Sequence, residues 1–251
     1  MKSILLTNDD GIDAEGLRVL EEALQGVAHL TVVAPDRERS AVSHGLTLRS
    51  PLDFREIRPD RYTLAGTPAD CVIFALGRLY VQMPDLVISG INHGANLGDD
   101  IMYSGTVAAA REAACHGVPA LAVSQAYQDG KPIRFKEGAA FVRRLVSALL
   151  GDGLRGEICL NVNFPIGRIK GMKITRQGCS EHVPHFNALD ARPEYDEIPP
   201  SPCGERPADL LSDHQAILDK YVSITPLQRD QTDYASARSL IREAARILLP
   251  G

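Results

Sequence analysis

Residues 4–11 read ILLTNDDG, an aliphatic run that ends in two adjacent carboxylates and a glycine. The run from Ile4 to Thr7 predicts a short buried strand. The next residues, Ala14 to Leu24, place leucines at helical spacing and predict an amphipathic helix. A second aliphatic run at Leu30 to Ala34 predicts another buried strand. A strand, a helix and a second strand in this order are typical of a parallel sheet.

The same alternation continues through the first two thirds of the chain. Strands are predicted at 85–89, 119–124 and 158–162, and helices at 68–79, 105–116 and 136–150. We therefore predict an α/β fold with a doubly wound, mostly parallel, Rossmann-like sheet.

Two regions interrupt this pattern. Residues 44–64 suit a hairpin or an extended excursion, and residues 179–212 are rich in proline with little periodicity. A strand is predicted at 221–226 and a final helix at 235–249. We expect a catalytic core at 1–178. Residues 179–251 would form a proline-rich arm, a returning strand and a C-terminal helix, without being an independent domain.

The composition narrows the class of protein. A formal net charge of −5 argues against a stable nucleic-acid complex, which needs many Lys and Arg side chains on one surface. The five cysteines are odd in number and form no C-x-x-C pair, so no disulfide framework is expected. The first apolar run is too short for a signal peptide, and no long apolar stretch follows. These features predict a cytoplasmic protein that does not associate with a membrane.

The adjacent carboxylates of Asp9 and Asp10 are the first candidate site. Ligands of open α/β sheets bind outside the carboxyl ends of the strands, where this loop would lie. Two like charges at a strand end repel each other, and a hard divalent cation with oxygen ligands is the simplest compensation. A solvated turn in which Asp10 or Asp13 caps the following helix fits the spacing equally well.

The loop after the second strand, residues 34–44, reads APDRERSAVSH. Ser40 can offer an oxygen to a metal ion, and His44 can donate to a phosphate. The alternative is a charged loop that simply faces water. The loop after the third strand, residues 89–100, is rich in glycine and asparagine, and the amide oxygen of Asn92 can bind a hard cation.

Ser104-Gly105-Thr106 begins the predicted helix at 105–116. Exposed N–H groups and the positive end of the helix dipole favour a phosphate there, and the two hydroxyls add donors. Ser104 as an ordinary N-cap is compatible with that role. Neither a G-x-G-x-x-G nor a Walker A element occurs, so a Rossmann-type dehydrogenase is disfavoured.

Taken together, seven ordered stretches resemble the SurE family of stationary-phase survival proteins, which are 5'/3'-nucleotidases. They are LLTNDDG (5–11), VVAPDRERSA (32–41), GTPADCV (66–72), PDLVISGINHGANLGDDIMYSGTVAAAREA (84–113), HGVPALAVS (116–124), LNVNFP (160–165) and YVSITPL (221–227). Two departures are His93, where family members often carry a small residue, and Lys220, which replaces a frequent glycine. The middle of 179–212 matches little.

The resemblance implies specific roles for residues in these motifs. One divalent cation per subunit, Mg²⁺ or Mn²⁺, would be held by Asp9, Asp10, Ser40 and Asn92. Phosphate contacts would come from Asn96 and from the Ser104-Gly105-Thr106 helix start. Family members form dimers or tetramers, so the resemblance implies a homodimer or homotetramer whose subunits associate through the C-terminal extension.

The expected function is a metal-dependent phosphomonoesterase that hydrolyses nucleoside 5'- and 3'-monophosphates, with short polyphosphate as a further candidate substrate. Asp9 or Asp10 would act as a base for attack by water. Direct attack on phosphorus by one of these aspartates is the alternative that the sequence leaves open. The alternative from another class is a regulatory module that binds metal and nucleotide without turnover.

Overall fold

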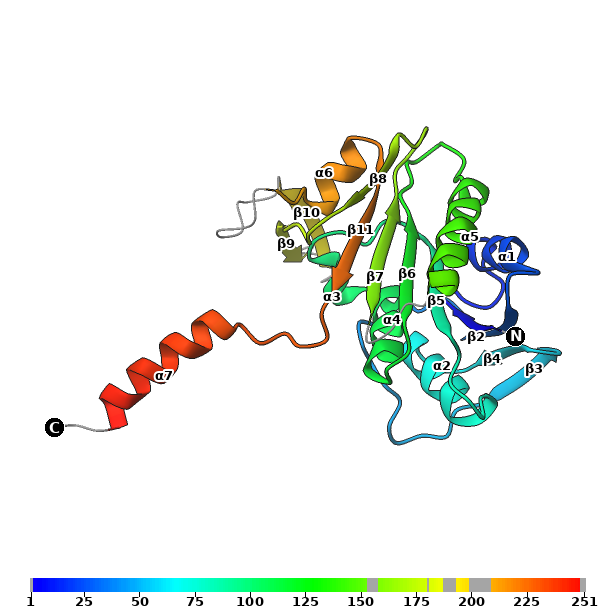
Figure 1. Cartoon of the computed structure of the whole chain (residues 1–251), viewed down its shortest axis with the longest axis horizontal. Helices are drawn as coiled ribbons and strands as arrows, with labels where there is room; N and C mark the ends of the chain where they lie inside the picture. Colours follow the sequence, from blue (N-terminus) through cyan, green and yellow to red (C-terminus); the bar gives the residue numbers. More distant parts are fainter. Residues whose placement is uncertain (1, 153–157, 180, 187–192, 199–208, 249–251) are drawn as a thin grey trace.

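The computed structural model describes residues 2–152, 158–179, 181–186, 193–198 and 209–248. Its centre is a nine-stranded sheet in the order β3-β4-β2-β1-β5-β6-β7-β11-β8 (Figure 1). The strands of this sheet are β1 (Ser3–Thr7), β2 (His29–Pro35), β3 (Phe54–Arg58), β4 (Arg61–Leu64), β5 (Leu86–His93), β6 (Ala120–Gln125), β7 (Cys159–Phe164), β8 (Gly171–Ile174) and β11 (Tyr221–Leu227).

The six neighbouring strands from β4 to β7 all run parallel to one another. Two antiparallel pairings, β3 with β4 and β7 with β11, extend this block on either side. The prediction of a mostly parallel α/β sheet is therefore confirmed. The excursion predicted at 44–64 contains the hairpin of β3 and β4.

Helices cover both faces of the sheet (Figure 1). One face packs against α1 (Glu15–Leu24) and α5 (Phe135–Asp152) through aliphatic side chains such as Leu17, Leu20 and Val142. The other face packs against α2 (Pro68–Phe74) and α4 (Gly105–Cys115), where small residues such as Ala109 allow a close approach. The helix predicted at 68–79 is α-helical only over Pro68–Phe74, and Ala75–Leu79 continues it as a π-helical turn.

The order of the parallel strands places a topological switch point at β1. The chain goes from β1 to β2 on one side of it, and later returns with β5 on the other side. Crossover connections then leave in opposite directions, so the loops after β1 and β5 separate from each other and form a crevice. The residues that follow β1 and β5 are therefore expected to line a ligand site.

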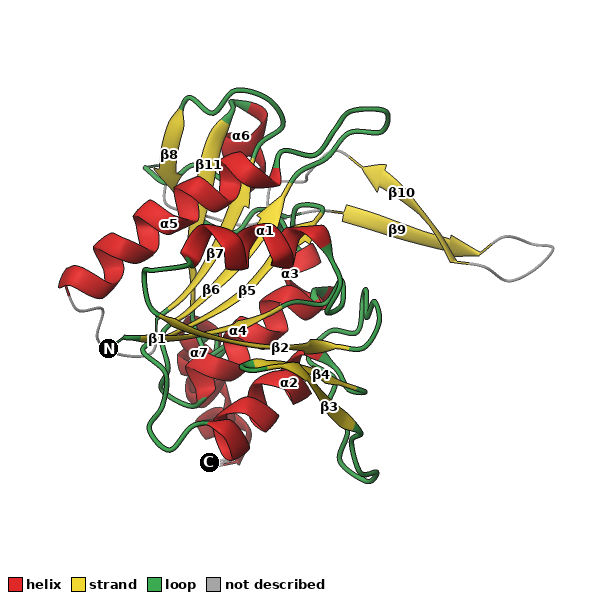
Figure 2. Cartoon of the chain, turned by 90° about the vertical axis from the view of Figure 1, so that its right-hand side faces the viewer, coloured by secondary structure: helices red, strands yellow, loops and turns green. Residues whose placement is uncertain are grey.

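The C-terminal part of the chain contributes to the sheet and also extends beyond it. After α6 (Asp213–Leu218), β11 inserts between β7 and β8. A separate antiparallel hairpin, β9 (Glu181–Phe186) with β10 (Pro193–Ile198), projects from the body (Figure 2). The helix α7 (Tyr234–Leu248) reaches away from the sheet (Figure 1). The domain division at residue 178 stays a prediction.

One cysteine differs from the other described cysteines. Cys179 is disulfide-bonded, and its partner lies outside the described residues, whereas Cys71, Cys115 and Cys159 are free. No helix in the described part of the chain combines the length and apolar character needed to cross a membrane.

Candidate active site

The NDDG loop is a tight turn that follows β1. The side chain of Asn8 accepts from Gly11 N at 3.2 Å and donates to Gly11 O at 2.8 Å, and Gly11 has φ +101°. The N-cap of α1 is Ala14, which makes no side-chain capping bond. The alternative in which Asp10 or Asp13 caps this helix is therefore wrong, and the two carboxylates are available for another role.

Asp9 is a buried carboxylate held by the start of α4. It is 5% exposed, and its oxygens accept from the backbone N–H of Thr106 at 3.0 Å and from the Thr106 hydroxyl. Burial raises the pKa of Asp9 to about 6, against the lowering effect of these two bonds, and the neighbouring charge of Asp10 adds to the rise. The two bonds from Thr106 therefore offset only part of the cost of burying this negative charge.

Asp10 is less buried and lies against the last residue of β5. Its Oδ2 atom accepts from the backbone N–H of His93 at 3.1 Å. Burial again raises the pKa of this carboxyl group, although the bond from His93 opposes the rise. The two carboxylates therefore join the loops on both sides of the switch point.

Ser40 lies on an exposed loop after β2 that is tied to the same centre. Arg39 N donates to the Asp9 carbonyl at 2.8 Å, and Ser43 N donates to the Tyr103 carbonyl at 2.9 Å. The Ser40 hydroxyl donates to Glu38 at 2.6 Å. Two non-glycine residues of this loop, Ala41 and Ser43, have positive φ, a conformation often found where function fixes a loop.

Asn92 and Asn96 come from β5 and the loop after it. The Asn92 side chain donates to Gly94 O at 2.9 Å, which leaves its carbonyl oxygen for another partner. Asn96 is 8% exposed, and its side-chain nitrogen donates to Ser124 at 2.7 Å. Its backbone is bonded to Asn161 and Asn163 of β7. Asn96 is therefore held in place from two neighbouring strands.

The start of α4 meets Asp9 directly. Ser104 is the N-cap, and its hydroxyl accepts from Val107 N at 3.1 Å. A Cβ atom on Gly105 would lie 3.0 Å from the Asp9 Cβ, so glycine permits this close approach. The Thr106 donors are directed at Asp9, which gives Thr106 a positioning role that spacing alone did not indicate.

His44 lies elsewhere than the predicted phosphate contact suggests. Its Nε2 atom is 2.7 Å from a carboxylate oxygen of Glu112, which also meets His116 at 3.0 Å. The contact joins the Ser40 loop to α4. His44 as a phosphate ligand stays a prediction that would require this contact to open.

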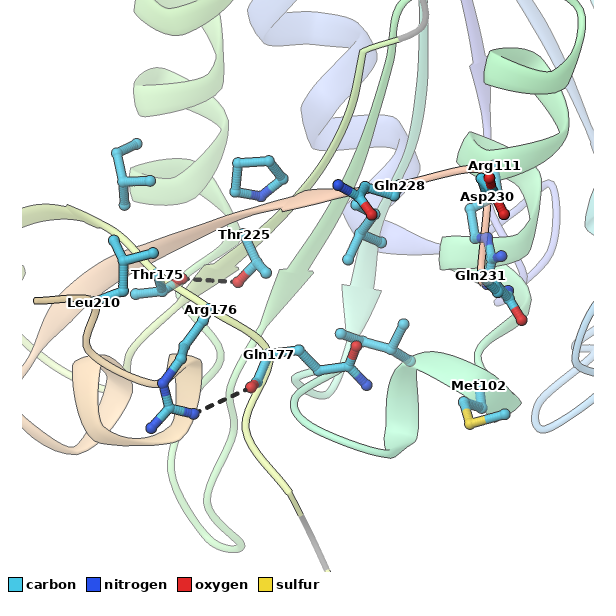
Figure 3. Close-up of a pocket in the computed structure, with 14 residues that line it drawn as sticks. Met102, Arg111, Thr175, Arg176, Gln177, Leu210, Thr225, Gln228, Asp230 and Gln231 are labelled. Atoms are coloured by element: carbon cyan, nitrogen blue, oxygen red, sulfur yellow. Dashed lines mark hydrogen bonds between the residues drawn. The ribbon is translucent and has the colours of Figure 1, made fainter. Parts of the chain in front are cut away.

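A hollow of about 200 Å³ unites most of the candidate residues. Its lining consists of Asp9, Ser40, Ala41, Asn92, His93, Ala95, Asn96, Asp100, Tyr103 and Ser104. A larger hollow of about 570 Å³ lies between α3 (Asp100–Tyr103), β8 and β11 (Figure 3). Asp230 is the single carboxylate in its lining, whereas Asp9 and Asp100 line the smaller hollow. Asp10 is not among the residues that line the smaller hollow.

The oxygen donors of the smaller hollow fit a hard divalent cation. Within the described ranges, no group of three His, Cys, Asp or Glu side chains is placed for a metal ion. Asp9 of this hollow and the adjacent Asp10 would need hydroxyl and amide oxygens, such as those of Ser40 and Asn92, to complete a ligand set. Such all-oxygen sets are typical of Mg²⁺ and Mn²⁺ sites.

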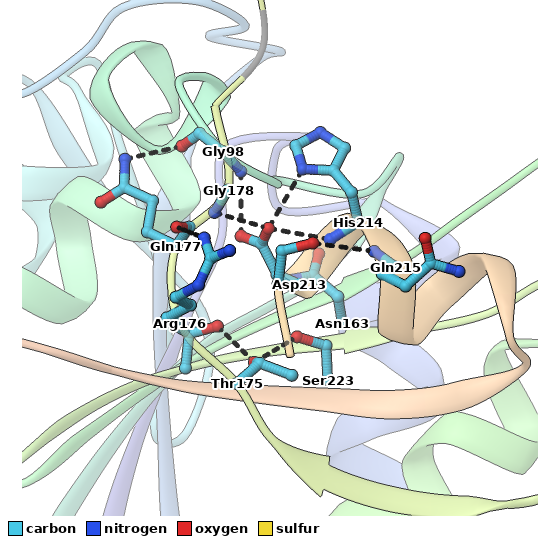
Figure 4. Close-up of polar contacts among 12 residues, drawn as sticks. Gly98, Asn163, Thr175, Arg176, Gln177, Gly178, Asp213, His214, Gln215 and Ser223 are labelled. Atoms are coloured by element: carbon cyan, nitrogen blue, oxygen red, sulfur yellow. Dashed lines mark hydrogen bonds and ion pairs between the residues drawn. The ribbon is translucent and has the colours of Figure 1, made fainter. Parts of the chain in front are cut away.

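Several supporting residues were missed by the motif-based prediction. Figure 4 shows the buried carboxylate of Asp213, which accepts from Gly98 N at 2.9 Å and from Gly178 N at 2.8 Å. Gln177 donates to Gly98 O at 2.8 Å. The bond from Gly98 N to Asp213 and the bond from Gln177 to Gly98 O fix the backbone two residues beyond Asn96. Asp213 gives no local signal of this role, because it reads only as an acidic residue at a helix start.

The pH dependence of the metal-free protein provides a test of the Asp9 environment. Because its folded pKa is raised, ionised Asp9 destabilises the fold, and this cost appears as pH rises from the ordinary value of 3.8 towards about 6. Asp9→Asn should therefore stabilise the metal-free protein at about pH 7.5 by up to about 3 kcal/mol, and much less at about pH 4.5. Urea unfolding with a chelator measures both differences; a gain that does not change with pH would contradict the raised pKa.

Comparison with known proteins decides the family. Residues 4–183 match the family model described as Survival protein SurE. The chain belongs to the SurE family. It is 47% identical over 244 residues to "5'-nucleotidase SurE" of Pelobacter propionicus, covering 94% of this chain and 96% of that protein. The SurE relative of Vibrio cholerae with the same name is 44% identical over 242 residues, covering 94% and 95%.

A solved structure gives the same result for the fold. The chain is similar to the SurE protein from Aquifex aeolicus with a TM-score of 0.81 and 39% sequence identity. The match covers 96% of this chain and 99% of that one. The SurE resemblance inferred from the motifs is thereby confirmed over nearly the whole chain.

Proposed function

We propose that this protein is a metal-dependent phosphomonoesterase that hydrolyses nucleoside 5'- and 3'-monophosphates to nucleoside and phosphate. The named relatives are 5'-nucleotidases, which supports this activity. The observation that carries the proposal is the single hollow in which Asp9, Asn92 and the Ser104 helix start meet. Carboxylate and amide oxygens suit a cation, and a helix N-terminus suits the phosphate.

The proposed site assigns the ligands of one divalent ion, Mg²⁺ or Mn²⁺, per subunit. Asp9, Asp10, Ser40 and Asn92 would hold it. When bound, the ion supplies charge stabilisation for the phosphate oxygens and favours ionisation of a nucleophile. Asp9 has the stronger case as a ligand, because its negative charge is buried and, among the described residues, its side chain accepts hydrogen bonds only from Thr106.

The remaining residues would bind and orient the phosphate. Asn96 and Ser104 line the hollow, and the backbone N–H of Gly105 lies at the positive end of the α4 dipole, whereas the next two N–H groups are already bonded to Asp9 and to the Ser104 hydroxyl. Their donors would stabilise the charge that develops on the phosphate oxygens. Thr106 would serve through Asp9, which it holds by two bonds.

In the proposed reaction, a new P–O bond forms to water while the ester P–O bond breaks. The water proton passes to Asp9 or Asp10, and the leaving oxygen takes a proton to become the nucleoside hydroxyl. Borohydride reduction of enzyme quenched during a single turnover distinguishes this path, since conversion of Asp9 or Asp10 to homoserine would show an aspartyl-phosphate formed by attack of the aspartate.

We further propose that the subunit works as a homodimer or homotetramer. The helix α7 projects from the body and exposes Leu240 and Ile241, which are 67% and 69% accessible. Exposed aliphatic residues on a projecting helix suit contact with a second copy of the chain. The core at 1–178, the extension at 179–251, the cytoplasmic location and activity on short polyphosphate stay predictions.

Phosphate release from AMP tests the proposed activity. With Mn²⁺ we expect release that stops on chelation and returns when metal is added. A non-catalytic regulatory module would bind AMP in the presence of metal but release no phosphate from any monophosphate. That result would replace the proposed function.

A further inference from the structure

Two aromatic rings meet at the rim of the smaller hollow, and the reaction proposed above does not use them. The ring centroids of His93 and Tyr127 lie 4.5 Å apart at an interplanar angle of 56°. His93 lines the smaller hollow of about 200 Å³, while Tyr127 lines a different hollow of about 180 Å³. Both side chains are exposed, and Tyr127 is 50% accessible.

The backbone under this pair is fixed. His93 pairs with Gln125 across β5 and β6, and Gly94 N donates to Gln125 O at 3.0 Å. A Cβ atom on Gly94 would lie 3.7 Å from the Tyr127 ring, so the ring lies over this glycine. His93 ends β5 and Tyr127 follows the end of β6 by two residues, so the carboxyl ends of neighbouring strands present the two rings as an aromatic surface.

The pair also stands next to the proposed cation ligands. The backbone nitrogen of His93 donates to Asp10 Oδ2 at 3.1 Å. The imidazole therefore belongs to a residue that contacts a proposed cation ligand. The smaller hollow has a volume of about 200 Å³. Sites that enclose a drug-sized ligand are larger, about 300–1,000 Å³. A nucleotide whose phosphate enters this hollow must therefore leave its base outside, on the rim.

We propose that the His93 and Tyr127 rings form the platform on which the nucleobase of the substrate stacks. This inference rests on the proposed function. Nucleobases stack on aromatic side chains through their π faces, which requires no hydrogen-bond readout and tolerates different bases. Tyr127 supports the imidazole from behind, so that His93 presents its ring to the base. The ribose bridges the distance between the phosphate in the hollow and this platform.

Two substrates that differ only by the base test the platform. AMP carries a base, and ribose 5-phosphate presents the same phosphate and sugar without one. His93→Ala and Tyr127→Ala should each lower the ratio of kcat/KM for AMP to that for ribose 5-phosphate by about 5- to 10-fold. His93→Phe should restore much of the ratio, because it returns an aromatic face. His29→Ala is the matched control, since His29 lies at the start of β2, away from the carboxyl ends of the strands.

The possible outcomes separate the platform from the reaction. An unchanged ratio would overturn the inference, as would an equal loss on both substrates, which would place His93 in the phosphate or metal site. If wild-type protein releases phosphate from neither substrate, the proposed function fails separately. Calorimetric titration with AMP then decides the platform, because His93→Ala must still weaken AMP binding by a similar factor.

Discussion

Asp9→Asn is expected to reduce metal-dependent phosphate release from AMP by more than about a hundredfold while the protein stays folded. Mutation of groups that only support metal ligands already costs about 10- to 100-fold, so loss of a ligand should cost more. The amide is close to the carboxylate in size and can still accept a bond from Thr106, and it removes a buried charge. Steady-state phosphate release and calorimetric titration with Mn²⁺ measure the two losses.

Asp13→Asn is the matched control for this variant. Asp13 lies four residues later in the same loop region, but its side chain faces solvent. Its replacement should leave phosphate release and Mn²⁺ affinity within about twofold of wild type, as is usual for exposed positions. Asp9→Asn with unchanged activity would remove the carboxylate from the mechanism, even if the fold and the SurE relationship stand.

The largest effect on stability is expected for Gly16→Ala. Gly16 is in the first turn of α1, where helix propensity alone predicts that alanine stabilises by about 1 kcal/mol. A Cβ atom there would lie 1.9 Å from the backbone oxygen of Ile91 and 3.2 Å from the Phe135 ring. Because backbone cannot rotate away, we expect destabilisation of about 2–4 kcal/mol. Urea unfolding measures it.

Gly77→Ala separates helix propensity from the clash. Nothing lies within 4 Å of a Cβ atom built on Gly77, which sits in the helical turn after α2. Alanine there should be neutral or stabilising by up to about 1 kcal/mol. Stabilisation by both substitutions would show that α1 and the Ile91 backbone are farther apart than the structure indicates.

The strand-end loops could be predicted because their positions follow from the fold. Short aliphatic runs alternating with amphipathic helices predict parallel strands, whose carboxyl ends share one edge of the sheet. Asp9, Ser40 and Asn92 each follow or end such a strand, so the sequence places them together before any contact is known. The hollow that they line confirms that they lie together, whereas their role as cation ligands stays a proposal.

Other parts of the site depend on contacts between distant residues. The bonds from Thr106 to Asp9 span 97 positions, and that from Gly98 to Asp213 spans 115. No local propensity or spacing encodes such partners. The same limit explains why the sequence alone cannot decide the helix-cap alternative. It also explains why the sequence favours a phosphate contact for His44, whereas the structure pairs this histidine with Glu112.

Anomalous scattering from a crystal soaked in Mn²⁺ tests the central proposal most directly. The proposal predicts one peak per subunit, at about 2.0–2.3 Å from oxygens of Asp9 and Asp10, with Ser40 and Asn92 completing the set. Crystals of Asp9→Asn should lack the peak, and those of Asp13→Asn should keep it. A peak bound by other residues, or none where AMP is hydrolysed, would contradict the proposed site.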